Sequence, residues 1–161
     1  MKIAICPGSF DPVTLGHVDI ITRASKIFDR VIVAVMVNPG KNPSFTIEER
    51  VQLLKDSCSG IDNVEIDAFS DLLVDFARDK EAVSIVRGLR AVSDFEYEFQ
   101  MALINKKLNR EVDTVFLTTS AENMYLSSSV VKEVASFGGD ISQFVPKAIH
   151  DKIKNRLYGR K

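Results

Sequence analysis

The feature that most limits the possible folds is a run of seven apolar residues from Val31 to Val37. A run that is apolar at every position is typical of a strand covered on both faces, as in a parallel sheet. Shorter apolar or alternating runs predict four more strands, at 3–6, 63–68, 83–86 and 114–118. Helical periodicity separates them, at about 17–28, 47–57, 71–80, 92–108, 129–136 and 146–158. This alternation predicts an α/β fold: a Rossmann-like, doubly wound, five-stranded parallel sheet with helices on both faces.

Length and charge narrow the class of protein further. The 161 residues suit one domain, residues 1–161, without a linker or an internal repeat. The 21 basic and 22 acidic residues give a net charge of −1, which predicts neither a nucleic-acid partner nor a membrane partner. No run has transmembrane length or the form of a signal peptide, so we expect a cytoplasmic protein. Cys6 and Cys58 stand apart from each other and from any histidine cluster, which favours buried thiols and predicts no protein metal site.

The first predicted strand leads through the loop Pro7 to Pro12 into a helix whose first turn carries Gly16 and His17. A helix that begins at the carboxyl edge of a sheet offers unpaired N–H groups and a partial positive charge, which suit phosphate. Gly16 lets a ligand approach the backbone closely, and His17 can donate a hydrogen bond to a phosphoryl oxygen. The alternative is an ordinary surface histidine at a helix start.

Further anion-binding candidates follow other predicted strands. Arg87 and Arg90 follow the fourth strand with Gly88 between them, and Lys41 follows the second. Guanidinium groups match phosphate oxygens well, although surface arginines on a turn are the alternative. The serines at 127–129 precede a helix without a closing capping box, so we expect its first N–H groups to remain available to an anion; simple N-capping is the alternative. All these groups lie at the carboxyl edge, where open parallel sheets bind ligands.

The predicted helix 92–108 carries two apolar stripes. One contains Phe95, Phe99, Ala102 and Leu103, and the other contains Tyr97, Met101, Ile104 and Leu108. A helix that is apolar on two sides is either sandwiched within one subunit or covered by a neighbouring subunit. The sequence leaves both alternatives open.

Several motifs together resemble those of the bacterial phosphopantetheine adenylyltransferases, over essentially the whole chain. The matching segments are Pro7–Pro12, Thr14–His17, Phe45–Arg50, Arg87–Arg90, Asp94–Glu98 and Leu126–Ser129. The Thr-Leu-Gly-His element alone marks the wider nucleotidyltransferase superfamily with the T/HxGH motif. The combination with Arg-Gly-Leu-Arg and Asp-Phe-Glu-Tyr-Glu is more specific.

The resemblance implies transfer of the adenylyl group of ATP to 4′-phosphopantetheine, giving dephospho-coenzyme A and pyrophosphate. It implies that His17 stabilises the transition state, that Mg²⁺ accompanies ATP, and that the protein is a homo-oligomer, typically a hexamer. The implied residues for 4′-phosphopantetheine are Ser9, Lys41, Leu73 and Arg87. The implied residues for ATP are Ser9, Phe10, His17, Gly88, Leu89, Arg90, Glu98, Asn123, Met124, Tyr125, Leu126, Ser127, Ser128 and Ser129. The sequence departs from the family pattern at 123–125, where relatives often have Trp-Ser-Phe or Tyr-Ser-Phe.

Three other functions share part of this pattern. A nicotinamide- or nicotinate-mononucleotide adenylyltransferase has the same first loop, but the segments Arg87–Arg90 and Asp94–Glu98 favour pantetheine. A nucleotide-binding sensor without catalysis is disfavoured because His17, Lys41 and both arginines are present. A fragment of a class I aminoacyl-tRNA synthetase is disfavoured by the short chain and by the lack of a KMSKS-like motif.

Overall fold

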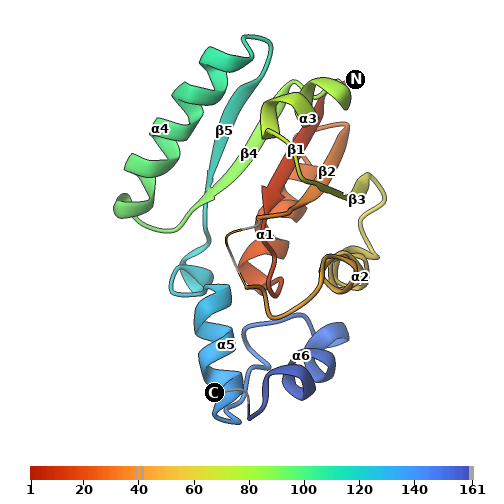
Figure 1. Cartoon of the computed structure of the whole chain (residues 1–161), viewed down its shortest axis with the longest axis vertical. Helices are drawn as coiled ribbons and strands as arrows, with labels where there is room; N and C mark the ends of the chain where they lie inside the picture. Colours follow the sequence, from red (N-terminus) through yellow and green to blue (C-terminus); the bar gives the residue numbers. More distant parts are fainter. Residues whose placement is uncertain (39, 41, 160–161) are drawn as a thin grey trace.

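The computed structural model describes residues 1–38, 40 and 42–159 (Figure 1). Its single sheet has five parallel strands in the order β3-β2-β1-β4-β5. These strands are β1 (Ile3–Gly8), β2 (Arg30–Met36), β3 (Val64–Phe69), β4 (Ser84–Leu89) and β5 (Asp113–Thr118). The helices are α1 (Leu15–Ser25), α2 (Ile47–Cys58), α3 (Leu73–Asp79), α4 (Val92–Leu108), α5 (Ser128–Ser136) and α6 (His150–Leu157), with 3₁₀ turns η1 (Ala121–Asn123) and η2 (Lys147–Ile149). Within the described part of the chain, no helix combines the length and the apolar character needed to cross a membrane.

Helices cover both faces of the sheet, because alternate strand residues point to opposite sides. Ala4 and Val33 belong to one core, which includes apolar residues of α1, α2, α5 and α6. Ile5 and Ile32 belong to a second core, which includes Ala77 of α3. The predicted Rossmann-like doubly wound sheet is therefore confirmed, and the fully apolar second strand is explained by its burial on both sides.

The order of the strands creates a switch point beside β1. From β1 the chain adds β2 and then β3 on one side, whereas β4 and β5 are added on the other side. The connections on the two sides of this point diverge, which leaves a crevice at the carboxyl ends of β1 and β4. Figure 1 shows α5 lying beyond these strand ends, where the chain arrives from β5.

Several predicted boundaries differ from the structure, and those of β1 and β4 affect the site. Strand β1 continues to Gly8 because Pro7 and Gly8 pair with β2, so only residues 9–12 of the predicted loop follow the strand. Strand β4 continues to Leu89 because Arg87, Gly88 and Leu89 pair with β5, so only Arg90 of the predicted turn follows the strand. Helix α1 ends at Ser25 rather than near residue 28. The final helix is likewise shorter than predicted, since the 3₁₀ turn η2 precedes it.

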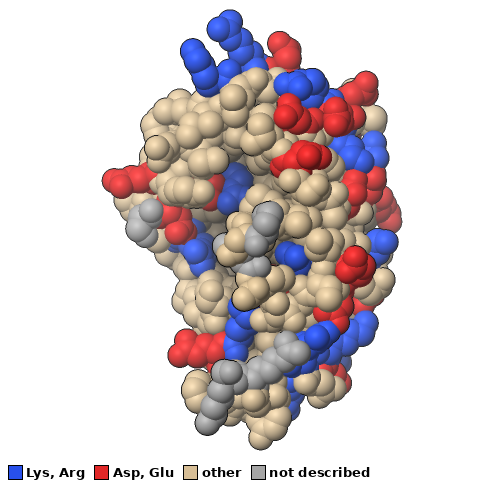
Figure 2. Space-filling model, viewed as in Figure 1, with Lys and Arg blue, Asp and Glu red and all other residues tan. Residues whose placement is uncertain are grey.

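Helix α4 has the predicted bounds but is not sandwiched within the subunit. The side chains of Tyr97 and Leu103, one from each apolar stripe, are 63% and 57% exposed. Phe95 stacks on Phe99 at 5.5 Å between ring centroids and meets Phe116 of β5 edge-on. Burial within one subunit, the first of the two alternatives, is therefore wrong. Figure 2 shows a largely uncharged surface over this helix, at the upper left.

Candidate active site

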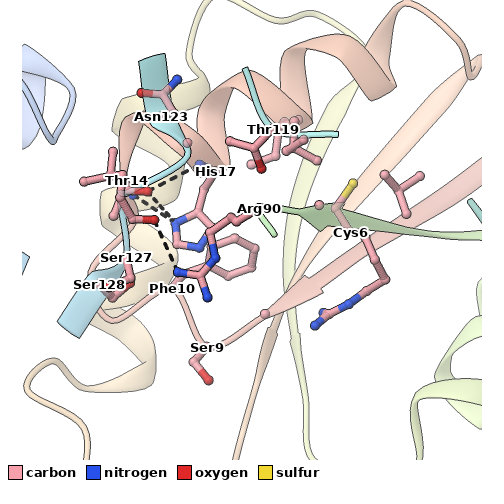
Figure 3. A pocket seen from close by; sticks show the side chains of 18 of the residues that line it. Cys6, Ser9, Phe10, Thr14, His17, Arg90, Thr119, Asn123, Ser127 and Ser128 are labelled. Carbon is pink, nitrogen blue, oxygen red and sulfur yellow. Dashed lines mark hydrogen bonds between the residues drawn. The ribbon is translucent and has the colours of Figure 1, made fainter. Parts of the chain in front are cut away.

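A cavity of about 340 Å³ lies at the carboxyl ends of β1 and β4, between the first turn of α1 and the start of α5 (Figure 3). Three segments that are far apart in the sequence meet there: the end of β1 with the loop and α1 that follow, the end of β4 with the first part of α4, and the chain from the end of β5 to the start of α5. The predicted residues that line it are Ser9, Phe10, His17, Arg87, Gly88, Arg90, Glu98, Asn123, Leu126, Ser127 and Ser128. The cavity thus occupies the switch point of the sheet, where ligands bind in folds of this type.

Other predicted residues lie elsewhere. Leu73 begins α3 and packs against the core on the opposite face of the sheet from α1. Lys41 lies outside the residues that the structure describes. Four predicted ATP contacts are neighbours in the sequence of residues that line the cavity but do not line it themselves. They are Leu89, Met124, Tyr125 and Ser129. The roles of all these residues remain predictions from the resemblance.

His17 is held by the residue that caps its own helix. The backbone N–H of Thr14 donates a hydrogen bond to Nδ1 of His17 over 3.0 Å. In return, the backbone N–H of His17 donates to Oγ1 of Thr14 over 3.4 Å, which completes a capping box. Because Nδ1 accepts a hydrogen bond, the proton of the neutral ring resides on Nε2. His17 therefore offers one N–H donor of defined direction.

The surroundings keep this imidazole neutral. Burial lowers the pKa of His17 from 6.5 to about 4, and the positive charges of Arg90 and Arg87 act in the same direction. The N-terminal end of α1 also disfavours a cation at this position. At neutral pH, His17 is thus a neutral hydrogen-bond donor, and it stays neutral in mildly acidic solution, where a histidine with the ordinary pKa becomes a cation.

Phe10 supports the imidazole from the side. Its backbone has a φ of +48°, in the left-handed region that few residues other than glycine adopt. This conformation brings the ring of Phe10 edge-on to His17, with 5.0 Å between the ring centroids. Gly8 makes room for it, because a Cβ atom at this position would lie 3.0 Å from the phenyl ring.

Arg87 and Glu98 form a bidentate ion pair on one wall of the cavity. Nε and Nη2 of Arg87 donate to the two carboxylate oxygens over 2.8 and 2.7 Å, and Nη1 donates to the carbonyl oxygen of Pro7 over 2.8 Å. Burial acts to lower the pKa of Arg87, but the Glu98 carboxylate outweighs it, so the pKa is raised overall. The predicted acceptor-phosphate residue and one predicted ATP residue are therefore in direct contact.

Arg90 connects the end of β4 to the segment before α5. Its Nε is 3.3 Å from the Asp94 carboxylate, and its Nη1 donates to the carbonyl oxygen of Leu126 over 3.4 Å. Oγ of Ser127 accepts a hydrogen bond from the N–H of Val130 over 3.2 Å. The alternative of simple N-capping is therefore confirmed for Ser127. The guanidinium group of Arg90 lies beside this helix start, as Figure 3 shows.

The sequence interpretation assigned no role to Thr14 or Asp94, although both belong to quoted motifs. The spacing of Thr14 and His17 is that of an N-cap and the third residue of a helix, which could have identified the capping box. Asp94 lies in the first turn of α4, four residues after Arg90, so it is close enough in the sequence to pair with an arginine that directly precedes the helix. Both contacts join residues that are only three or four positions apart, so the sequence spacing could have predicted them.

The chemical character of the cavity is that of an anion site. Figure 2 shows basic side chains within the hollow at the middle of the visible face. The carboxylates that line the cavity, Asp94 and Glu98, are each paired with an arginine. Among the described residues, no group of three or more His, Cys, Asp or Glu side chains is placed to hold a metal ion. The site can bind phosphate groups and stabilise negative charge on them.

Fold and cavity together define a doubly wound α/β protein with an anion-binding cavity at the switch point of its sheet. Among solved structures, the fold matches a putative nicotinate-nucleotide adenylyltransferase from Vibrio parahaemolyticus with a TM-score of 0.69 and 18% identity, covering 95% of this chain and 99% of that one. It also matches a bifunctional NMN adenylyltransferase/ADP ribose pyrophosphatase from Francisella tularensis with a TM-score of 0.72 and 16% identity, covering 96% of this chain and 48% of that one. At these identities, the comparison shows a shared fold.

Sequence comparisons define the family. The cytidylyltransferase-like family model matches residues 5–134. A phosphopantetheine adenylyltransferase of Alkaliphilus metalliredigens (strain QYMF) is 62% identical over 149 residues, 92% of this chain and 95% of the relative. One from Lachnoclostridium phytofermentans is 55% identical over 161 residues, covering 100% and 99%. The chain belongs to the cytidylyltransferase-like family and, within it, to the phosphopantetheine adenylyltransferases.

Proposed function

We propose that this chain transfers the adenylyl group of ATP to 4′-phosphopantetheine, giving dephospho-coenzyme A and pyrophosphate. The structural observation that carries the proposal is the neutral His17, oriented by Thr14 in a cavity lined by Arg87 and Arg90. The identity of the acceptor is supported by relatives named phosphopantetheine adenylyltransferase that match nearly the full chain.

The proposed reaction is an in-line displacement at the α-phosphorus of ATP. A phosphate oxygen of 4′-phosphopantetheine forms the new P–O bond, while the bond to the β-phosphate breaks and its electron pair leaves with pyrophosphate. The attacking phosphate is already ionised at neutral pH, so the reaction needs no general base. Positioning and charge stabilisation then supply most of the catalysis.

His17 has the geometry for the charge-stabilising role. Its Nε2–H donates to a non-bridging oxygen of the α-phosphate, where negative charge builds in the transition state. A neutral donor whose tautomer is already fixed by Thr14 needs no reorganisation during the step. Arg90 and the N-terminus of α5 bind the nucleotide phosphates beside it.

The acceptor is proposed to bind on the other wall. Ser9 and Arg87 contact its phosphate, together with Lys41 and Leu73, whose roles rest on the resemblance alone. The remaining ATP contacts proposed from the resemblance are Phe10, Gly88, Leu89, Glu98, Asn123, Met124, Tyr125, Leu126, Ser127, Ser128 and Ser129. For Leu89, Met124, Tyr125 and Ser129, contact with ATP requires a rearrangement of the cavity or a contact at its rim.

Mg²⁺ is proposed to accompany ATP and to neutralise charge on its phosphates. The cavity fits such a carried ion, because its carboxylates are already paired with arginines and form no cluster. Mg²⁺ commonly keeps several waters and is bound through substrate phosphates. The side chains around the cavity then hold the phosphate oxygens that the ion leaves uncovered.

We propose that the protein is a homo-oligomer, specifically a hexamer as in the family that the sequence resembles. This assembly would explain the exposed apolar surface of α4. Its exposed apolar side chains, among them Tyr97 and Leu103, form a surface that soluble monomers rarely present. A second copy of the chain would cover it. A cytoplasmic location belongs to the same proposal, as the sequence predicts.

One assay tests the proposed function. Purified protein is incubated with ATP, Mg²⁺ and 4′-phosphopantetheine, and pyrophosphate release is measured beside a parallel reaction with nicotinate mononucleotide. We expect release only with 4′-phosphopantetheine. Release only with the mononucleotide would contradict the acceptor, and ATP binding without any release would favour a nucleotide sensor.

A further inference from the structure

A buried carboxylate behind the cavity joins three segments of the chain. Asp11 is 7% exposed and is not part of the cavity lining. Its Oδ1 accepts a hydrogen bond from the N–H of Phe45, and its Oδ2 accepts one from the N–H of Ser44, both over 2.9 Å. Nζ of Lys132, on α5, lies 3.0 Å from the same Oδ2. One side chain thus connects the loop after β1, the segment before α2 and the middle of α5.

The next residue of the loop is tied to α5 as well. Oγ of Ser128 donates to the carbonyl oxygen of Pro12 over 2.7 Å. Ser128 and Lys132 are four residues apart, so they lie on the same face of α5. Two consecutive loop residues, Asp11 and Pro12, are therefore fastened to one face of the helix whose first turn lines the cavity.

The loop is also held from the side of α2. Arg50 is 5% exposed, and its Nη1 donates to the carbonyl oxygen of Ser9 over 2.9 Å. Between these attachments lies Phe10, whose ring packs edge-on against His17. A shift of the loop would move this ring and the imidazole beside it. The same shift would change the distance between His17 and the start of α5.

We propose that Asp11 and Lys132 are a positioning pair for adenylyl transfer, which sets His17 and the first turn of α5 at the separation that the reaction needs. This inference rests on the proposed function and deepens it. The pair touches no substrate, and it acts through Phe10, His17 and Ser128. Misplacement of reacting groups by about 1 Å can cost on the order of 100-fold in rate, so a buried tie at this position has a measurable catalytic effect.

The test compares Lys132→Met with Lys132→Arg and with the matched control Lys80→Met. Lys132→Met removes the ion pair but leaves Asp11 the hydrogen bonds from two backbone N–H groups. Lys132→Arg keeps a cation within reach of the carboxylate. Lys80 also pairs with an aspartate, Asp67 at 2.6 Å, and its side chain is 32% exposed, as is that of Lys132. It lies next to α3, away from the cavity lining.

For Lys132→Met we expect kcat for pyrophosphate release to fall roughly 10- to 100-fold, while the KM values for ATP and 4′-phosphopantetheine change by less than about threefold. Lys132→Arg should recover most of kcat, and Lys80→Met should keep the rate of the wild type. Asp11→Asn combined with Lys132→Met should cost less than the product of the two single effects, because both remove the same pair. An unchanged kcat in Lys132→Met, or an equal loss of kcat in Lys80→Met, would contradict the proposed role of the pair.

A second measurement does not depend on turnover. In ¹⁵N NMR spectra of the labelled protein, Lys132→Met should shift or broaden the ring signals of His17, whereas Lys80→Met should leave them in place. If His17 signals respond as expected but wild-type protein releases no pyrophosphate with 4′-phosphopantetheine, the proposed function fails, while the effect of the pair on the position of His17 stands. Identical His17 spectra in both variants would contradict the pair, whatever the activity.

Discussion

At the scale of single residues, the chemistry of His17 is set by its contacts with neighbouring residues of the protein. Thr14 fixes the tautomer, Phe10 packs against the ring, and burial with Arg90 and Arg87 keeps the imidazole neutral. A neutral donor can stabilise charge that develops on a phosphoryl oxygen without itself gaining a proton. Two predictions at this scale separate that role from a merely structural one.

Replacing His17 by alanine should remove the donor and leave the cavity otherwise intact. We expect kcat to fall by a few orders of magnitude, about 3–4 kcal/mol of transition-state stabilisation, while ATP binding measured by calorimetry is retained. His150→Ala is the control, because His150 begins α6 and pairs with Asp151. Turnover in His17→Ala equal to that of His150→Ala would contradict the assigned role.

The pKa of His17 has a consequence for stability. In the unfolded chain this group has its ordinary pKa of 6.5, whereas in the folded chain burial and the two arginines hold it near 4. Between these pH values the unfolded state binds more protons than the folded state, so the free energy of unfolding rises with pH. The contribution of His17 to stability is complete above about pH 6.5 and is lost as the pH falls from there toward 4. The lost contribution is on the order of 2 kcal/mol after allowance for solvent screening.

Chemical unfolding at pH 4.5 and pH 7.5 measures this dependence. The wild-type protein should lose more stability on acidification than His17→Gln, which has no group to titrate at this position. NMR titration should show the His17 ring unchanged from pH 8 down to about pH 5. A His17 midpoint near 6.5 would refute the neutral donor.

At the scale of elements, close packing between β4 and α1 places the helix that carries His17. Gly88 lies in β4, and a Cβ atom there would stand 3.0 Å from Cγ1 of Ile20 on α1. The absence of a side chain lets the helix approach the strand at the cavity. The continuation of β4 through this glycine was not predicted, because its pairing partner in β5 lies about thirty residues further along the chain.

Gly88→Val should push α1 away from the sheet. We expect a loss of about 1–3 kcal/mol in unfolding free energy from overpacking, together with a lower kcat, because His17 moves with the helix. Gly60→Val provides the control, since no atom lies within 4 Å of a Cβ at Gly60. Equal stability and turnover in the two variants would show that the close approach has no effect.

At the scale of the whole molecule, the single chain leaves one apolar surface, that of α4, uncovered. The sheet, its two cores and the cavity are formed within the subunit, yet α4 leaves its apolar stripes in solvent. Phe95 and Phe99 stack on each other, which still leaves their outer surfaces uncovered. A neighbouring copy of the chain is the proposed cover.

Leu103→Glu should disrupt this contact between subunits. In sedimentation velocity we expect a hexamer for the wild-type protein and smaller species for the variant, because a buried unpaired carboxylate is costly. Ile27→Glu is a matched control, since Ile27 is 55% exposed and Leu103 is 57% exposed. A strictly monomeric wild-type protein would reject the oligomer.

Local patterns in the sequence predict the parallel sheet and the strand–loop–helix start, and the resemblance to the family adds many of the residues that line the cavity. The apolar run from Val31 to Val37 predicted a strand buried on both faces, and the Gly16-His17 pair predicted the phosphate-binding edge. These signals are local: they depend on periodicity, on turn residues and on helix starts, which neighbouring residues specify among themselves. The later motifs identified the family for the same reason.

The pairing of groups that are distant in the sequence depends on the fold. Arg87 donates hydrogen bonds to Glu98 and to the carbonyl oxygen of Pro7, and Asp11 pairs with Lys132, which is 121 residues away in the sequence. No local pattern specifies such partners, because they depend on which strand ends and helix faces the folded sheet brings together. The neutral state of His17 is decided in the same way, since burial and the positions of two arginines exist only in the folded chain.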